Sequence, residues 1–132
     1  MKLAFGCIFL MVLSCMATAN ETECSENKID LPNLEGKTYH EARKTIISKG
    51  WKPNQTIFLK LASESPDIQF GNGPLFWKKG YIELESCAGT GMGWCAFSFK
   101  KNKMKIQIIT IGEESPEDKV YAVVDKQLLL CN

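Results

Sequence analysis

The N-terminal segment constrains the rest of this chain most, because it predicts the compartment in which the chain folds. Met1-Lys2 supplies a positive charge, residues 3–13 form an apolar run, and Ala17-Thr18-Ala19 has the small-residue spacing of a cleavage site. This order is typical of a secretory signal peptide. We therefore predict a signal peptide over residues 1–19 and a single secreted or periplasmic domain over residues 20–132.

Val12-Leu13-Ser14-Cys15 offers a second way to process the same leader. This tetrapeptide resembles a bacterial lipobox, in which the cysteine is lipidated and becomes the first residue of the mature protein. Leucine is atypical two positions before that cysteine, and the cleavage site follows at once. We favour cleavage after Ala19, and a lipoprotein anchored through Cys15 stays open as the alternative.

An exported chain is expected to use its cysteines in disulfides rather than as metal ligands or redox groups. Four cysteines follow the leader, and they allow three pairings. Cys87 and Cys95 bracket a glycine-rich turn, so a local bridge between them is easy, and Cys24 and Cys131 would then join the two ends of the domain. We favour this pairing because crossed bridges would need both ends to lie near one hairpin.

Size and charge exclude several classes of function. Cleavage would leave about 113 residues, which is one small domain with a thin core. Apart from Lys2, the 15 basic residues balance the 15 acidic ones, and Arg43 is the single arginine. A neutral chain argues against nucleic acid or an anionic membrane as the main partner. No second long apolar stretch follows the leader, so we expect no membrane span after cleavage.

A helix is expected over residues 38–49. Thr38 is a good N-cap, Glu41 three residues later completes a capping box, and Gly50 is a natural stop. Apolar residues recur at helical spacing on one face, namely Tyr39, Ala42 and Ile46. This amphipathic segment needs another apolar surface to cover it.

Strand patterns follow the helix. Alternating or β-rich runs lie at residues 81–85, 96–100, 104–111 and 120–124, with weaker candidates at residues 29–31 and 51–61. Residues 63–74 and 113–118 read as loops. One helix followed by successive antiparallel strands predicts an α+β domain in which the helix packs on an antiparallel sheet, with two disulfides.

The glycine-rich segment Ala88–Trp94 is the best candidate for a binding site. A dinucleotide-binding loop would need a helix after it, but the following residues have a strand pattern, so a wide hairpin turn fits better. A stapled turn loses little entropy on binding, which makes Gly91, Met92 and Trp94 a plausible recognition tip. Most of the nearby aromatic residues are expected in the core. Trp77 is the exception, because Lys78-Lys79-Gly80 beside it suggests an exposed turn.

No residue pattern commits the chain to catalysis. His40, the only histidine, is expected on the polar side of the helix. No free cysteine is expected for it to activate as a nucleophile. Glu83 and Glu85 lie two apart and should share the solvent face of a strand, although a paired acid/base site is conceivable. The acidic residues between 113 and 118 lack the spacing of a calcium loop. We expect no cofactor and no metal.

Two segments resemble known proteins. Residues 31–38, Leu-Pro-Asn-Leu-Glu-Gly-Lys-Thr, followed by Glu41-Ala42 and Gly50-Trp51, resemble the opening half of a PASTA domain. That resemblance implies a strand–helix–strand start and recognition of cell-wall fragments. The rest of the chain departs from the family, since it lacks the closing valine-rich strands and carries cysteines. Residues 80–91, with the Cys-x-Phe-x-Phe that begins at Cys95, resemble small exported bacterial proteins without an assigned function, which supports export and the Cys87–Cys95 bridge.

These observations predict an exported, non-catalytic protein that binds another protein or an envelope component, as inhibitors and immunity proteins do. Recognition is assigned to Gly91, Met92 and Trp94, with Trp77 added. Two alternatives stay open: a PASTA-like module that binds cell wall, and a small hydrolase that uses carboxylates such as Glu83 and Glu85.

Overall fold

A computed structural model describes residues 29–131 of the chain. The predicted signal peptide, the lipidation site at Cys15 and the Cys24 half of the terminal bridge lie outside these residues. Within them, no helix is long and apolar enough to cross a membrane. Cys131 is disulfide-bonded, and its pairing with Cys24 stays a prediction.

Helix α1, Tyr39–Ser48, forms where its capping signals place it. The Thr38 hydroxyl accepts a hydrogen bond from the Glu41 amide at 3.3 Å, and the Glu41 carboxylate accepts one from the Thr38 amide at 3.3 Å. This reciprocal capping box satisfies two backbone donors that the first turn of a helix leaves free. Three side chains of α1 are buried, as the spacing predicts: Tyr39, Ala42 and Ile46.

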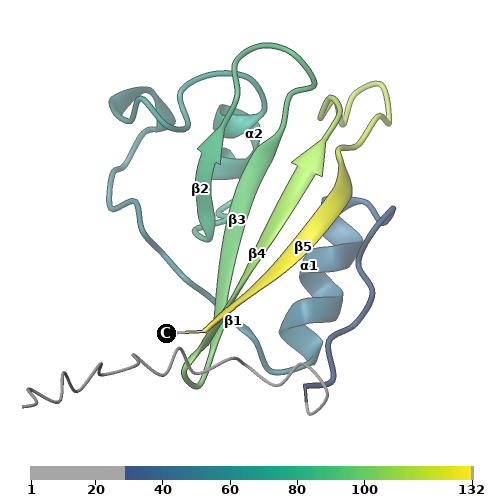
Figure 1. Ribbon diagram of the computed structural model, residues 1–132. Coiled ribbons are helices and arrows are strands. Elements are labelled where there is room, and N and C mark those ends of the chain that lie inside the picture. The colour runs from purple at the N-terminus through teal and green to yellow at the C-terminus, as the bar shows by residue number, and fades with distance from the viewer. Residues whose placement is uncertain (1–28, 132) are drawn as a thin grey trace, which may run out of the picture.

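A five-stranded antiparallel sheet forms the second layer. Its long strands are β3, Cys95–Lys101, β4, Met104–Ile111, and β5, Val123–Cys131. Strand β2, Leu84–Cys87, and the two-residue β1, Lys52–Pro53, both pair with the outer edge of β3. Figure 1 shows β3, β4 and β5 running side by side. The α+β class, with a helix packed on an antiparallel sheet, is confirmed.

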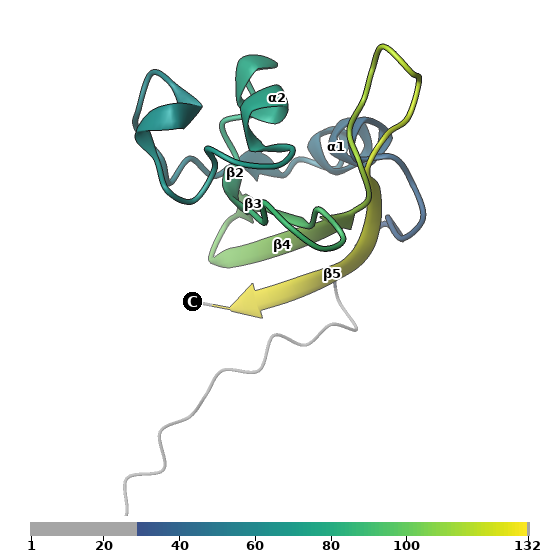
Figure 2. The ribbon, with the colours of Figure 1, turned by 90° about the horizontal axis from the view of Figure 1, so that it is seen from above.

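Helices α1 and α2 cover the same face of the sheet, and within residues 29–131 the other face carries no helix (Figure 2). Helix α2, Gly73–Lys78, lies beside α1 on this face. Between the layers, the Tyr39 ring stacks on Phe97 with centroids 3.6 Å apart, and Phe76 of α2 meets Phe97 edge-on. Alternate residues of β4, Ile106 and Ile108, are fully buried beneath them. These aromatic contacts join α1, α2 and β3 into one core.

Several expected boundaries were wrong. Residues 29–31 form no strand. Of the expected run 51–61, only residues 52–53 form a strand. The last strand begins at Val123 rather than at residue 120. The expected loop 63–74 contains a short 3-10 helix, η2, Ala62–Glu64, and the start of α2. Proline in the first turn of a helix costs no hydrogen bond, so Pro74 lies in the first turn of α2 instead of excluding a helix.

Candidate functional site

The disulfide between Cys87 and Cys95 fixes the base of the glycine-rich hairpin. The two cysteines face each other at the paired ends of β2 and β3, and the Ala88 amide bonds the Trp94 carbonyl at 2.8 Å just above them. Gly91 and Gly93 have φ angles of +72° and +62°, which glycine adopts without strain. The predicted local bridge is confirmed, and it indicates an oxidising extracytoplasmic compartment.

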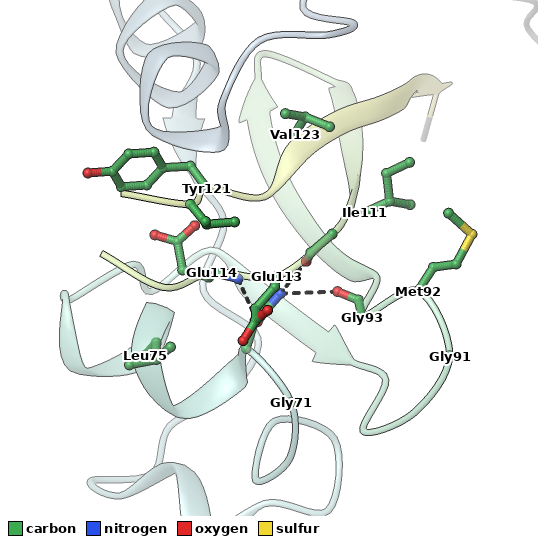
Figure 3. Close-up of a pocket in the computed structure, with 13 residues that line it drawn as sticks. Gly71, Leu75, Gly91, Met92, Gly93, Ile111, Glu113, Glu114, Tyr121 and Val123 are labelled. Carbon is green, nitrogen blue, oxygen red and sulfur yellow. Dashed lines mark hydrogen bonds between the residues drawn. The ribbon is translucent and has the colours of Figure 1, made fainter. Parts of the chain in front are cut away.

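Asn72 holds the hairpin against two other segments of the chain. Its side-chain amide donates to the Gly93 carbonyl at 3.2 Å and to the Gly112 carbonyl at 2.8 Å, and its carbonyl oxygen accepts from the Glu114 amide at 3.0 Å. These are the dashed lines in Figure 3. The Gly112 amide also bonds the Met92 carbonyl at 2.8 Å. The hairpin tip is therefore held at two neighbouring residues, Met92 and Gly93.

Gly71, the residue before Asn72, lets this end of the molecule pack closely. A β-carbon at this position would lie 2.3 Å from the Ala88 carbonyl oxygen, so only glycine fits there. Nearby, the Cys87 amide bonds the Asp67 carbonyl at 2.7 Å. The segment before α2 and the hairpin thus form one rigid unit.

A hollow of about 700 Å³ lies between the hairpin tip, the start of α2 and the chain on either side of the acidic loop. Figure 3 shows Met92 on one side of this hollow and Leu75 and Tyr121 on the other. Its lining residues are Gly71, Asn72, Leu75, Gly91, Met92, Gly93, Ile111, Gly112, Glu113, Glu114, Val120, Tyr121 and Val123. We call it the tip hollow.

A second hollow, of about 540 Å³, lies on the other side of Met92, over the face of the sheet that no helix covers. We call it the sheet hollow. Trp94 lines it together with residues of β4 and β5, including Ile109 and Leu128. Gly91 and Met92 line both hollows. Met92 is 68% exposed and Trp94 42% exposed, and Gly91 is also exposed, so the three predicted tip residues lie together in solvent.

Trp77 lies apart from that group. It belongs to α2, packs partly buried against the core, and donates its indole N–H to the Lys60 carbonyl at 3.2 Å. It lines neither hollow. The exposed turn expected beside it begins only after α2 ends, so the structure does not join Trp77 to the tip.

His40 supports the tip hollow from behind. Its Nε2 lies 2.5 Å from a Glu114 carboxylate oxygen, and its Nδ1 lies 2.7 Å from the Tyr81 hydroxyl. The second Glu114 oxygen accepts from the Ala122 amide at 3.1 Å. The expectation of an exposed histidine was wrong, because the imidazole is only 18% exposed. In the tautomer with the proton on Nε2, Nε2 donates to Glu114 and Nδ1 accepts from the Tyr81 hydroxyl. Both ring nitrogens are then engaged within the fold, and among the described residues His40 bonds no serine, threonine or cysteine side chain.

A buried ion pair continues this polar chain beneath α1. Glu83 is fully buried and accepts from the Tyr39 hydroxyl at 2.7 Å and from Arg43 Nε at 2.6 Å. The Arg43 guanidinium lies 4.4 Å from the centroid of the Tyr81 ring. Burial, reinforced by the Glu83 charge, raises the pKa of Tyr39 well above its usual value. Burial also raises the pKa of Tyr81. These groups bond one another and form a structural network beneath α1.

Glu83 and Glu85 do not form a pair. The expectation that both lie on the solvent face was wrong for Glu83, which bonds Tyr39 and Arg43 on the helix-covered face. Glu85 is partly buried, and its carboxylate bonds the side chains of Lys105 and Gln107 at 2.8 Å. Both partners lie on the face of β4 opposite its buried isoleucines, Ile106 and Ile108. A register shift between Leu84 and Ser86 interrupts the strand alternation at this point.

The site contains residues that the local pattern did not reveal. From the sequence, Asn72 was expected in a loop and Glu114 in the acidic loop that follows β4. Both side chains are buried in the structure. Most of their partners lie 21 to 74 positions away in the sequence, so no local spacing identifies them. Among residues 29–131, no group of three or more acidic, histidine or cysteine side chains could hold a metal ion.

The chain matches no family model, no curated protein and no solved structure in these comparisons.

Proposed function

We propose that this chain is an exported, non-catalytic binding protein that recognises another protein or an envelope component with its hairpin tip, in the manner of an inhibitor or immunity protein. The single observation that carries the proposal is the exposure of Met92 and Trp94 on a latched loop. Large apolar side chains held rigidly in solvent are typical of interaction sites. Because the loop is already ordered, binding loses little conformational entropy.

The two hollows strengthen this proposal. They flank Met92 and give a partner concave surfaces on both sides of a projecting side chain. The interactions of His40, Tyr39 and Arg43 are directed into the fold. They therefore support the scaffold rather than a reaction.

Site-specific photo-crosslinking tests the proposal. A photoreactive phenylalanine analogue replaces Met92 in the chain expressed with its own leader. A matched variant carries it at Lys103, an exposed residue in the turn between β3 and β4. We expect a discrete crosslinked species from position 92 and none from position 103. Equal labelling from both positions, or none from position 92, would remove the proposal.

The crosslinked partner then permits a quantitative check. Trp94→Ala should raise the dissociation constant about 30-fold, the loss typical of an interface hot spot. Its thermal unfolding midpoint should match that of the unmodified chain, because Trp94 is exposed. A variant that unfolds would instead make Trp94 a structural residue.

A further inference from the structure

The two hollows beside Met92 differ in charge. The tip hollow is lined by two carboxylates, Glu113 and Glu114, and by no lysine, arginine or histidine. The sheet hollow is lined by Asp125 and Lys126, whose charges cancel. A cationic group of a partner would complement the tip hollow, whereas the sheet hollow has no net charge to complement.

Glu113 is the carboxylate that a partner can reach. Both oxygens of Glu114 already have protein partners, and its side chain is buried. Glu113 is exposed, and within the described residues its carboxylate forms no ion pair and no hydrogen bond. An incoming cation would therefore meet an open acceptor without breaking an existing bond.

The remaining walls suit a long side chain with an apolar stem. Leu75, Val120 and Val123 line the hollow with Met92 and Ile111. Tyr121 is 38% exposed and lines the same hollow, where its ring offers a π surface. This ring meets the His40 ring edge-on, with the two centroids 5.5 Å apart. Aliphatic stems pack on such walls while a cationic head stays at the polar rim.

We propose that the tip hollow receives an arginine side chain of the partner protein. A planar guanidinium can lie against the Tyr121 ring and donate two parallel hydrogen bonds to the Glu113 carboxylate. An ammonium group cannot do both in one position, which favours arginine over lysine. This inference rests on the proposed function and names the chemistry of the partner at the same site.

A matched pair of peptides tests the inference on the folded chain. Acetyl-Gly-Arg-Gly-amide is titrated to about 20 mM and followed by NMR of the backbone amides, since single side chains bind in the millimolar range. The control is the same peptide with citrulline, which keeps the shape and loses the charge. We expect saturable shifts at residues 112, 113 and 121 with the arginine peptide and none with the citrulline peptide.

Two variants locate the contact. Glu113→Gln should raise the dissociation constant of the arginine peptide about fivefold, whereas Glu117→Gln, a change in the same acidic loop but outside the hollow, should leave it within about twofold. Equal shifts with citrulline, no saturable shifts, or equal effects of the two variants would overturn the inference. The crosslink from position 92 is independent of this result, so a failed titration with a retained crosslink removes only the arginine assignment.

Discussion

Beneath α1, apolar rings enclose a few polar groups, whereas at the hairpin end polar bonds and a disulfide hold apolar side chains in solvent. In the first region the Tyr39 hydroxyl bonds Glu83, and the Arg43 guanidinium lies over the Tyr81 ring. In the second, Asn72 fixes the loop from which Met92 projects. The two arrangements differ in effect: burial of apolar surface stabilises the domain, whereas the rigid frame at the hairpin end keeps apolar surface exposed to solvent.

This difference predicts that changes beneath α1 lower stability, while changes at the hairpin end alter the shape and order of the tip. A small domain has little free energy of unfolding to lose, so the two kinds of effect should separate in experiments. The three predictions below run from the largest expected effect to the smallest.

Arg43→Met should lower the free energy of unfolding by about 3 kcal/mol, because it leaves the buried Glu83 carboxylate with the Tyr39 hydroxyl alone. Urea unfolding followed by tryptophan fluorescence measures the loss. The double variant Arg43→Met/Glu83→Leu should lose less than Arg43→Met, since no charge stays buried. A double variant that is less stable than the single one would contradict this explanation.

Asn72→Ala should lower the free energy of unfolding by about 2 kcal/mol, because a buried amide and two carbonyls lose their partner. The Gly112 amide, which bonds the Met92 carbonyl, should then exchange its hydrogen faster with solvent. Asn54→Ala is the matched control, since it removes one bond from the Asn54 side chain to Ser98, away from the tip. Equal acceleration of Gly112 exchange in both variants would show that Asn72 has no local role.

The raised pKa of Tyr39 predicts how stability depends on alkaline pH. The folded state keeps the Tyr39 proton above the unfolded pKa of about 10, so stability is complete below that pH and falls as the pH rises. One such proton gives a slope of at most about 1.4 kcal/mol per pH unit. Tyr39→Phe should show a shallower fall than the unmodified chain above pH 10, with the Tyr81 contribution retained. Identical slopes in urea titrations would contradict this assignment.

Local sequence signals accounted for the elements that depend on near neighbours. The capping box from Thr38 to Glu41 began α1, the alternation in residues 104–111 matched β4, and the short spacing of Cys87 and Cys95 identified their bridge. The glycines between these cysteines also marked the exposed tip. Each signal arises from contacts within a few residues, which periodicity and spacing reveal.

The two-residue β1 and the six-residue α2 escaped the same reasoning. Lys52 and Pro53 carry no pattern of their own and pair only because β3 offers them an edge. Short elements gain most of their stability from packing, so local preference does not decide them.

By itself, the sequence determined the helix, the central hairpin and the Cys87–Cys95 bridge, and it marked the exposed glycine-rich turn between these cysteines. Only the tertiary structure decided that Glu83 is buried, that His40 supports Glu114, and that Asn72 latches the tip. These three side chains find partners 21 to 74 positions away. The sequence around a polar side chain does not show whether its hydrogen-bond partner will be a distant protein group or water. Only the folded structure therefore decides the role of such a side chain.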